Sequence, residues 1–535
     1  MINLLVKNCK AYTMEKEGEF FEAFTVKNGR ISELLHEIPD SYAANAKQVI
    51  DMEGKAIIPG LIDSHFHFMP TCALRQRAIK VSEIVDGGMV PTCIEDVGKK
   101  LKEISAEMNK LLPIICYSYV IASIQEDRLP FRQELDEWLP GCTVIVLSMD
   151  GHSSAYSTAS LKKMGISEEG HNGILSGEDH EFNMGRINNI LFDNLTLPTL
   201  AKSMQLVVND ALSYGITGIH CMEGFEDAIE DKALDFFMRF AGILPLRIRT
   251  YIQYKEVARA LKYVSRMTRP RIGGCGSWEV DGAIGSRTAA FDESYADDPS
   301  CFGKTYYDSM QLAEMLRATE GYGFQTSVHA IGTRGIEQIL QAYETVGTTE
   351  DLRARIDHFE FPNEDQTRRA IQNMHLVISV QPGYTWMDSI YQKSYDKYLR
   401  PEQYNRQIPL KTISEMGGIL CGSSDSPVQH FNPFLQMQGM VNYPIEDQRL
   451  SVYQALRTYT YNGAYATFEE ADRGTLAVGK LADFVVLNND PFTIDKDKLI
   501  ELKSEQTYIA GKAAREMNMG TLSFIVKGFL NRNRI

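Results

Sequence analysis

The sequence has no uninterrupted apolar segment long enough to cross a membrane. No stretch approaches about 18 consecutive apolar residues, the length that indicates a transmembrane helix. The first residues, MINLLVKNCKAYTM, also lack the apolar core of a signal peptide, because polar residues interrupt them early. We therefore expect a cytoplasmic protein with no membrane partner.

Paired cysteines are absent too. The nine cysteines are an odd number, scattered from Cys9 to Cys421, and no two of them form a CxxC pair. This pattern fits reduced thiols better than a disulfide framework or a zinc ribbon. We expect most of them to be small core residues, since no sequence signature supports a nucleophilic cysteine.

Positive charge is scarce relative to negative charge. The chain has 55 Lys and Arg against 70 Asp and Glu, a formal net charge of −15. Binding to a phosphate backbone needs clustered Lys and Arg, so we expect no nucleic-acid partner. The apolar share of 44% and the charged share of 23% are those of an ordinary globular protein. The length of 535 residues accommodates a barrel of about 250 residues with accessory domains.

Both ends of the chain have the pattern of a small β-domain. Residues 1–59 contain short strand-like runs around the turn pair Asn28-Gly29. Residues 470–535 likewise alternate apolar stretches with Gly, Asn and Asp turns. We predict one composite β-sandwich domain made of residues 1–59 plus 470–535.

Between these ends, residues 60–469 alternate strand-like apolar runs with helical segments, as parallel strands joined by crossover helices do. The predicted strands are 60–67, 216–222, 246–252, 272–281, 325–331, 355–361, 376–382 and 418–425. Eight parallel strands close a barrel, so we predict an α/β fold with a TIM-like (β/α)8 barrel. The long interval at about 70–200 predicts an inserted subdomain over the active-site face.

His65 and His67 form the strongest chemical motif. They end the run PGLIDSHFH. On a strand, HxH puts both imidazoles on one face, where they can share one divalent ion. Catalytic groups of TIM barrels lie at such strand ends. The pair alone is weak evidence, because the chain has eleven histidines.

Three further candidates lie at the ends of later predicted strands: His329 in TSVHAIG, His358 in RIDHFEF and Asp425 in CGSSDSP. Any one of them could be a core residue that only forms hydrogen bonds. A role in the core does not readily explain why all three lie at the ends of separate predicted strands. Divalent metal ions that are neither hard nor soft accept imidazole and carboxylate ligands together. A carboxylate beside a metal can also take a proton from water. We therefore predict a divalent metal site with one or two ions, zinc being the expected metal.

Four motifs in this order resemble the amidohydrolase superfamily, specifically its family 3 branch. They are PGLIDSHFH, DGHSSAYSTASL (150–161), VDGAIGSRTA (280–289) and GTLAVGKLADFVVL. The resemblance covers nearly the whole chain and extends to N-substituted formamide deformylases and related amide hydrolases. It implies a TIM barrel with a composite β-sandwich, a divalent metal centre, and hydrolysis of a carbon–nitrogen bond in a small amide, of the N-acyl or N-formyl kind.

The resemblance also implies roles for individual residues. His65 and His67 would bind the more buried ion, and His329 and His358 the second one. Asp425 would contact the metal and act as general base, taking a proton from the attacking water and passing it to the departing nitrogen.

Other residues are candidates for contact with the substrate. The resemblance implies that His152, in DGHSSAYS, faces the substrate and stabilises the oxyanion, although a loop histidine that caps a turn explains it equally well. Asp281 and Arg287 are expected to bind substrate, with a structural Asp–Arg pair around the Gly-rich loop as the alternative. For His220, at the end of the second predicted strand, we favour packing.

One position departs from the family pattern. Family members usually carry a carboxylated, metal-bridging lysine four residues before the Asp of the DG motif, and here that residue is Ser277. Glu279 lies two residues further on, and strand alternation puts it on the same face, so it is a candidate bridging ligand. The alternatives are that Glu279 pairs with a basic group such as Arg287, and that the site holds one ion. A bulge near Gly273-Gly274 or Gly276 would break the alternation.

Two other functions stay open. Fold and metal do not determine the substrate, so a deaminase or cyclic-amide hydrolase on the same scaffold is possible. A catalytically inactive binding protein is the third alternative, against which the retained histidines and Asp425 argue. We expect a homodimer.

Overall fold

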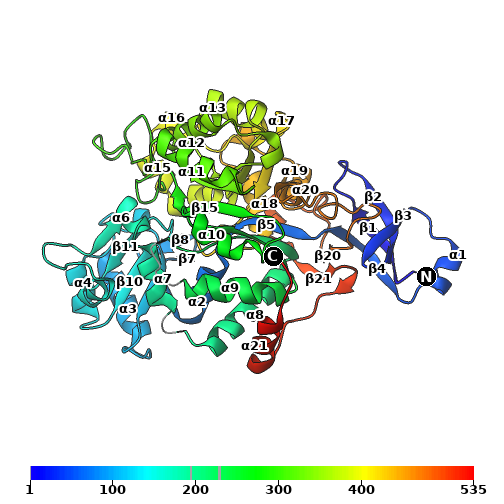
Figure 1. The fold of residues 1–535 in the computed structure, drawn as a ribbon, viewed down its shortest axis with the longest axis horizontal. Coiled ribbons are helices and arrows are strands. Elements are labelled where there is room, and N and C mark those ends of the chain that lie inside the picture. Colours follow the sequence, from blue (N-terminus) through cyan, green and yellow to red (C-terminus); the bar gives the residue numbers. More distant parts are fainter. Residues whose placement is uncertain (1, 193–194, 227–230) are drawn as a thin grey trace.

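A barrel of eight parallel strands forms the centre of the molecule in the computed structural model, which describes residues 2–192, 195–226 and 231–535 (Figure 1). In sheet order its strands are β5 (Leu61–Phe66), β13 (Ile216–Glu223), β14 (Arg247–Ile252), β15 (Arg271–Glu279), β16 (Gln325–Ala330), β17 (Arg355–His358), β18 (Val377–Val380) and β19 (Ile419–Gly422). Each of the eight strands coincides with one of the predicted runs. The predicted (β/α)8 barrel is confirmed.

The barrel closes between its first and last strands. An isolated parallel bridge joins Phe66 to Ser426. The backbone amide of Asp425 donates to the carbonyl oxygen of His65, and that of His67 donates to the carbonyl oxygen of Ser426, both at 2.9 Å. The closing seam therefore holds His65, His67 and Asp425 next to one another.

Helices surround the barrel. They include α8 (Leu197–Ser213), α9 (Lys232–Phe240), α11 (Ser309–Glu320), α12 (Thr333–Val346) and α18 (Pro433–Val441). In α12, Ile336, Ile339, Leu340 and Tyr343 are buried, the spacing of a helix with one apolar face. Asp308 caps the amino end of α11 by accepting from the amides of its first turn.

One seven-stranded sheet contains strands from both ends of the chain. Its order is β22 (Lys512–Ala513), β21 (Ser504–Ile509), β20 (Phe484–Leu487), β4 (Val49–Pro59), β1 (Leu4–Tyr12), β2 (Phe20–Lys27) and β3 (Arg30–Leu35). Asn28 and Gly29 connect β2 to β3 with φ of 53° and 76°, as a tight hairpin turn requires. The two-layer sandwich and the exact domain boundaries stay predictions.

The interval after the first barrel strand contains a sheet of its own. It has five strands in the order β12 (Ile174–Ser176), β11 (Ser153–Tyr156), β10 (Val144–Ser148), β9 (Ile114–Tyr119) and β6 (Ile79–Lys80). Helix α3 (Ile94–Ser105) packs on this sheet through Val97 and Leu101, which belong to a separate buried cluster. In Figure 1 this part, in cyan, lies across the barrel from β1–β4, in blue.

No helix in the described ranges is long and apolar enough to cross a bilayer.

Candidate metal centre and active site

Side chains of the kinds that bind divalent metals converge at the carboxyl ends of the barrel strands. They come from β5, β15, β16, β17 and the segments that follow β5 and β19. The group consists of His65, His67, Cys275, His329, His358 and Asp425. We call these six residues the histidine–thiolate centre. All of them except His65 line one cavity.

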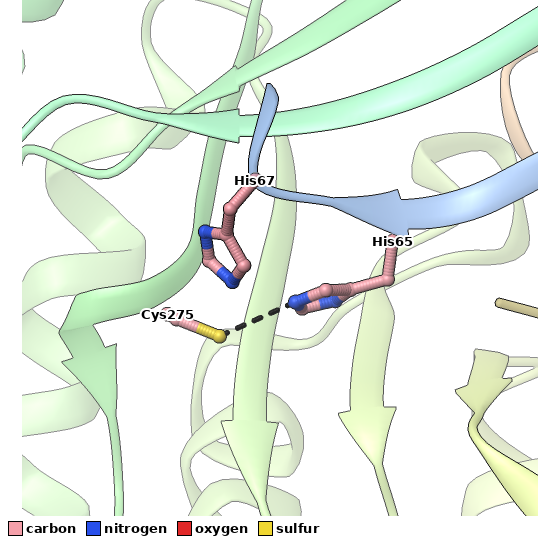
Figure 2. A group of neighbouring side chains, drawn as sticks. All are labelled: His65, His67 and Cys275. Atoms are coloured by element: carbon pink, nitrogen blue, oxygen red, sulfur yellow. Dashed lines mark hydrogen bonds between the residues drawn. The ribbon is translucent and has the colours of Figure 1, made fainter. Parts of the chain in front are cut away.

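Cys275 lies in the middle of this group. Its Sγ is 3.4 Å from Nε2 of His65, 3.9 Å from Nε2 of His358 and 4.0 Å from Nδ1 of His329. Figure 2 shows the imidazoles of His65 and His67, from β5 and its end, turned toward the sulfur on β15. A thiolate in this position can share a metal ion with the histidines on either side of it.

Asp425 joins the two histidines of β5. Its Oδ1 lies 3.3 Å from Nε2 of His65 and 3.2 Å from Nε2 of His67. Burial alone would raise the pKa of this carboxyl, but the two imidazoles hold it well below its usual range. Asp425 is therefore ionised at neutral pH, as a metal ligand or general base must be.

Neighbouring side chains orient the imidazoles. Nδ1 of His358 lies 2.9 Å from Oε1 of Gln381, whose amide nitrogen in turn donates to Ser423 Oγ at 2.9 Å. This contact leaves Nε2 of His358 free to face Cys275. Nδ1 of His65 lies 3.4 Å from Asp357, a carboxylate paired with Arg355. Such contacts to the second ring nitrogen are typical of metal-binding histidines.

The protonation states of two of the histidines, His329 and His358, suit a metal ion. Burial lowers the pKa of His358 to about 4 and that of His329 well below its usual value, so both are neutral, the form that coordinates. Burial and nearby carboxylates raise the pKa of the Cys275 thiol well above its usual range. A thiolate there needs a cation beside it. Oδ1 of Asp425 also has no hydrogen-bond partner among the described residues.

The structure places Cys275 among His65, His329 and His358, and groups Glu279, the predicted bridge, with His152 and Glu181 instead. The pairing of β15 with β16 shifts register between Gly274 and Glu279, and Gly273 and Gly274 have φ of 106° and 107°. This bulge ends the strict alternation on which the prediction depended. Ser277 is absent from the cavity lining, and its carbonyl oxygen accepts from the Tyr307 hydroxyl at 3.1 Å. In the sequence, the glycines around Cys275 are the feature that indicates this bulge.

Glu279 instead lies beside His152, the histidine of the DGH segment. Both residues line the cavity, together with Glu181, a residue that the sequence did not single out. Nδ1 of His152 is 3.0 Å from Oε1 of Glu181 and 3.8 Å from Oε2 of Glu279. Glu279 also accepts from the amide of Gly276 at 2.8 Å, which closes the bulge.

Asp281 does not line this cavity. Its buried carboxylate accepts hydrogen bonds from the backbone amides of Ala290, Ile331 and Gly332, at 2.8–2.9 Å. These contacts fasten the loop after β15 to the loop after β16. A structural role accounts for Asp281, and the predicted substrate contact is not seen.

Arg287 is likewise absent from the cavity lining. It forms ion pairs with Asp127 and with Asp297, the latter at 2.7 Å, and its guanidinium lies over the ring of Tyr398. The structure therefore does not bring Arg287 to the substrate cavity, nor does it pair Arg287 with Asp281 or Glu279. His220 is fully buried with Nδ1 3.3 Å from Arg355, which agrees with a packing role.

The rest of the cavity is mainly apolar. One wall comes from the interval after the first barrel strand, with Leu147, Met184, Ile187 and Leu191 among its residues, and Val428, from the segment after β19, also lines the cavity. None of the described residues that line the cavity is Lys or Arg. The cavity is therefore suited to a neutral or cationic molecule with an apolar part.

The fold and the six converging side chains define a TIM-barrel protein with its site at the carboxyl ends of the strands. The chain belongs to the amidohydrolase family, whose sequence profile matches residues 48–514. It is 26% identical to YtcJ of Bacillus subtilis over 534 residues, which cover 94% of this chain and 98% of YtcJ.

Two further proteins are similar over nearly their full length. An N-substituted formamide deformylase of Arthrobacter pascens is 23% identical over 552 residues, covering 96% of this chain and 98% of the deformylase. The crystal structure of an uncharacterized metal-dependent hydrolase from Pyrococcus horikoshii shares the fold, with a TM-score of 0.71, 22% identity, and coverage of 92% of this chain and 99% of that one.

Proposed function

We propose that this protein is a metal-dependent hydrolase that cleaves the carbon–nitrogen bond of a neutral, apolar N-acyl or N-formyl amine. The observation that carries this proposal is the convergence of four imidazoles, one thiol and Asp425 at the carboxyl ends of the barrel strands. Zinc is the proposed metal, because imidazole, thiolate and carboxylate are its usual ligands. The histidine–thiolate centre would hold one or two ions through His65, His67, Cys275, His329, His358 and Asp425.

A divalent ion in this centre lowers the pKa of water and polarises a carbonyl group. Asp425 is the proposed general base, since its carboxylate is ionised and contacts both histidines of β5. It takes one proton from the attacking water and delivers it to the nitrogen of the departing amine, which is otherwise a poor leaving group.

His152 is the proposed partner of the carbonyl oxygen. It lines the cavity, and its ring centre lies 5.1 Å from that of His329. Because Nδ1 faces Glu181, Nε2 is the ring nitrogen left for the substrate. A proton on Nε2 would stabilise negative charge on the oxygen as the tetrahedral centre forms.

The lining of the cavity favours a substrate whose amine part carries no carboxylate. A substrate carboxylate would be buried beside Glu181, Glu279 and Asp425, with no Lys or Arg among the described lining residues to pair with it. Burying an unpaired charge is unfavourable. The name of the Arthrobacter relative, an N-substituted formamide deformylase, fits a substrate of the favoured kind.

A matched substrate pair tests this proposal. N-formyl-2-phenylethylamine and N-formylphenylalanine differ only by the α-carboxylate. The zinc-loaded protein should release the amine from the first compound with a kcat/KM at least about tenfold higher, because one unpaired buried charge costs more than 1.4 kcal/mol. Chelation of the metal should abolish the activity. A preference for the amino acid derivative contradicts the proposed substrate class, and activity without metal contradicts the proposed mechanism.

A further inference from the structure

A second group of metal-binding side chains lines the same cavity, beside the histidine–thiolate centre. His152, Glu181 and Glu279 come from the segment before β11, from α6 (Glu178–Glu181) and from the end of β15. Their ligand atoms all lie within 4.8 Å of one another. The three residues are 7%, 8% and 4% exposed. We call this group the carboxylate site.

The distances in the carboxylate site fit one coordination sphere. Nδ1 of His152 lies 3.0 Å from Glu181 Oε1 and 3.8 Å from Glu279 Oε2. Ligand atoms about 2.1 Å from a divalent ion are roughly 3.0–3.5 Å apart along the edges of octahedral or tetrahedral coordination. Small side-chain adjustments are therefore enough to put all three atoms around one ion.

For its two buried carboxyls, the carboxylate site offers one imidazole, that of His152, as a possible cationic partner. Oε2 of Glu279 is buried without a hydrogen-bond partner among the described residues, while its other oxygen accepts from Gly276. No described residue that lines the cavity is Lys or Arg. Burial raises the pKa of Glu181 to about 8 and that of Glu279 well above its usual value. Two adjacent buried carboxyls ionise together only when a cation lies near both.

We propose that His152, Glu181 and Glu279 bind a divalent transition-metal ion, such as Zn²⁺ or Mn²⁺, in addition to any ion in the histidine–thiolate centre. One imidazole with two carboxylates is a ligand set that these ions accept. This site is independent of the metal centre on which the proposed hydrolysis depends.

The ion in the carboxylate site also fixes the tautomer of His152. Without it, Nδ1 lies 3.0 Å from Glu181 Oε1 and either group can donate, so both tautomers are open to the neutral ring. With the ion on Nδ1, the ring proton lies on Nε2. The ion therefore holds neutral His152 as a hydrogen-bond donor at the nitrogen left for the substrate.

Cobalt titration separates the two sites. Co²⁺ bound to Cys275 gives a thiolate-to-cobalt charge-transfer band, whereas Co²⁺ in the carboxylate site gives none because that site has no sulfur. The metal-free wild type and the Glu181→Gln/Glu279→Gln double variant are dialysed against the same free Co²⁺ concentrations, and bound cobalt is counted by elemental analysis. The double variant should bind one ion fewer per chain with an unchanged charge-transfer band.

Glu178→Gln is the matched control. Glu178 lies on the same short helix as Glu181 but pairs with the exposed Lys304, so this variant should bind as much cobalt as the wild type. If the double variant does not fold, the single variants Glu181→Gln and Glu279→Gln are tested instead. Each should bind the cobalt ion of the carboxylate site, which gives no charge-transfer band, at least tenfold more weakly. Equal cobalt counts in the wild type and these variants overturn the proposal. A missing charge-transfer band instead contradicts the histidine–thiolate centre, so the two failures are distinguishable.

Discussion

Strands β5 and β15 both bring ligands to the histidine–thiolate centre, but of the two only β15 does so through residues with positive φ. His65 lies on β5 and His67 directly after it, and both contact the same oxygen of Asp425, although the pairing of β5 with β13 shifts register. On β15, the ladder with β16 runs through Gly273 and Gly274, which have φ above 100°, and is interrupted after Gly274, where Cys275 takes the place among the histidines. Side-chain spacing predicts which face a residue occupies only where the backbone keeps ordinary strand dihedrals.

The bulge in β15 gives the chain two adjacent sets of ligands. It turns Cys275 toward the histidines and sends Glu279 to His152 and Glu181. A continuous strand would put Cys275, Ser277 and Glu279 on one face. Substitutions on each side can test the contrast between β5, which has no residue with positive φ, and the bulged β15.

The largest expected effect is at Asp425, which follows β19 and contacts both His65 and His67. Asp425→Asn removes the proton acceptor but keeps the shape of the side chain, so the fold and most of the bound metal should remain. The kcat should fall at least about a hundredfold, the low end of general-base contributions. Steady-state hydrolysis and metal analysis of the same sample measure both quantities. A near-normal rate removes Asp425 from the role of base.

The next largest effect is expected for Gly273→Ala, which tests whether the bulge in β15 is required for stability and metal binding. A Cβ at Gly273 would lie 1.9 Å from the carbonyl oxygen of Ser327, at a φ that side chains rarely adopt. Gly273→Ala should lower the free energy of unfolding by about 2 kcal/mol and weaken metal binding as well. Gly347→Ala is the control, because Gly347 also has positive φ, 72°, but open space around it. Gly347→Ala should lower the free energy of unfolding by less, about 1 kcal/mol, and should leave metal binding unchanged.

If Gly273→Ala and Gly347→Ala change thermal unfolding and metal content to the same extent, the β15 bulge has no special part in the centre.

A smaller effect separates Cys275 from Ser277, the residue at the position where the family resemblance implies the bridging lysine. Cys275→Ser should weaken zinc binding at least about tenfold, since a soft ligand in direct reach of His65 is replaced by a poor one. Ser277→Ala should change zinc binding little, because Ser277 does not line the cavity. Competition with a chromophoric chelator measures both affinities. The reverse ranking would contradict the role of Cys275 as a metal ligand.

The smallest effect on metal binding and activity is expected at Asp281. Burial raises its pKa to about 7 in spite of three backbone amide donors, so the carboxyl is about half ionised at pH 7. Asp281→Asn leaves at least one of these buried amides without its acceptor and should cost about 1–3 kcal/mol of stability. Metal content and KM should be unchanged, as measured on the folded variant. A large rise in KM would show that Asp281 contacts the substrate after all.

Much of the barrel could be predicted from sequence, because each barrel strand is a short apolar run between helical segments. His65, His67, His329, His358 and Asp425 were found because each of them follows such a run. The composite sheet was suggested by similar turn-rich patterns at the two ends, which β4 and β20 join directly.

The remaining site residues depend on long-range contacts that local patterns do not encode. Cys275 reaches the centre only because Gly273 and Gly274 accommodate the close approach of Ser327 and Met222. Glu181 carries no motif and comes from a four-residue helix. Arg287 was assigned to the substrate pocket, but its partner Asp127 is far away in the sequence.

X-ray absorption at the zinc edge tests the central claim most directly, because it identifies the atoms bound to the metal. In the zinc-loaded wild type, the account predicts a sulfur ligand at about 2.3 Å together with nitrogen and oxygen ligands at about 2.0–2.2 Å. The sulfur component should disappear in Cys275→Ser. A first shell that contains only nitrogen and oxygen in the wild type would contradict a histidine–thiolate centre.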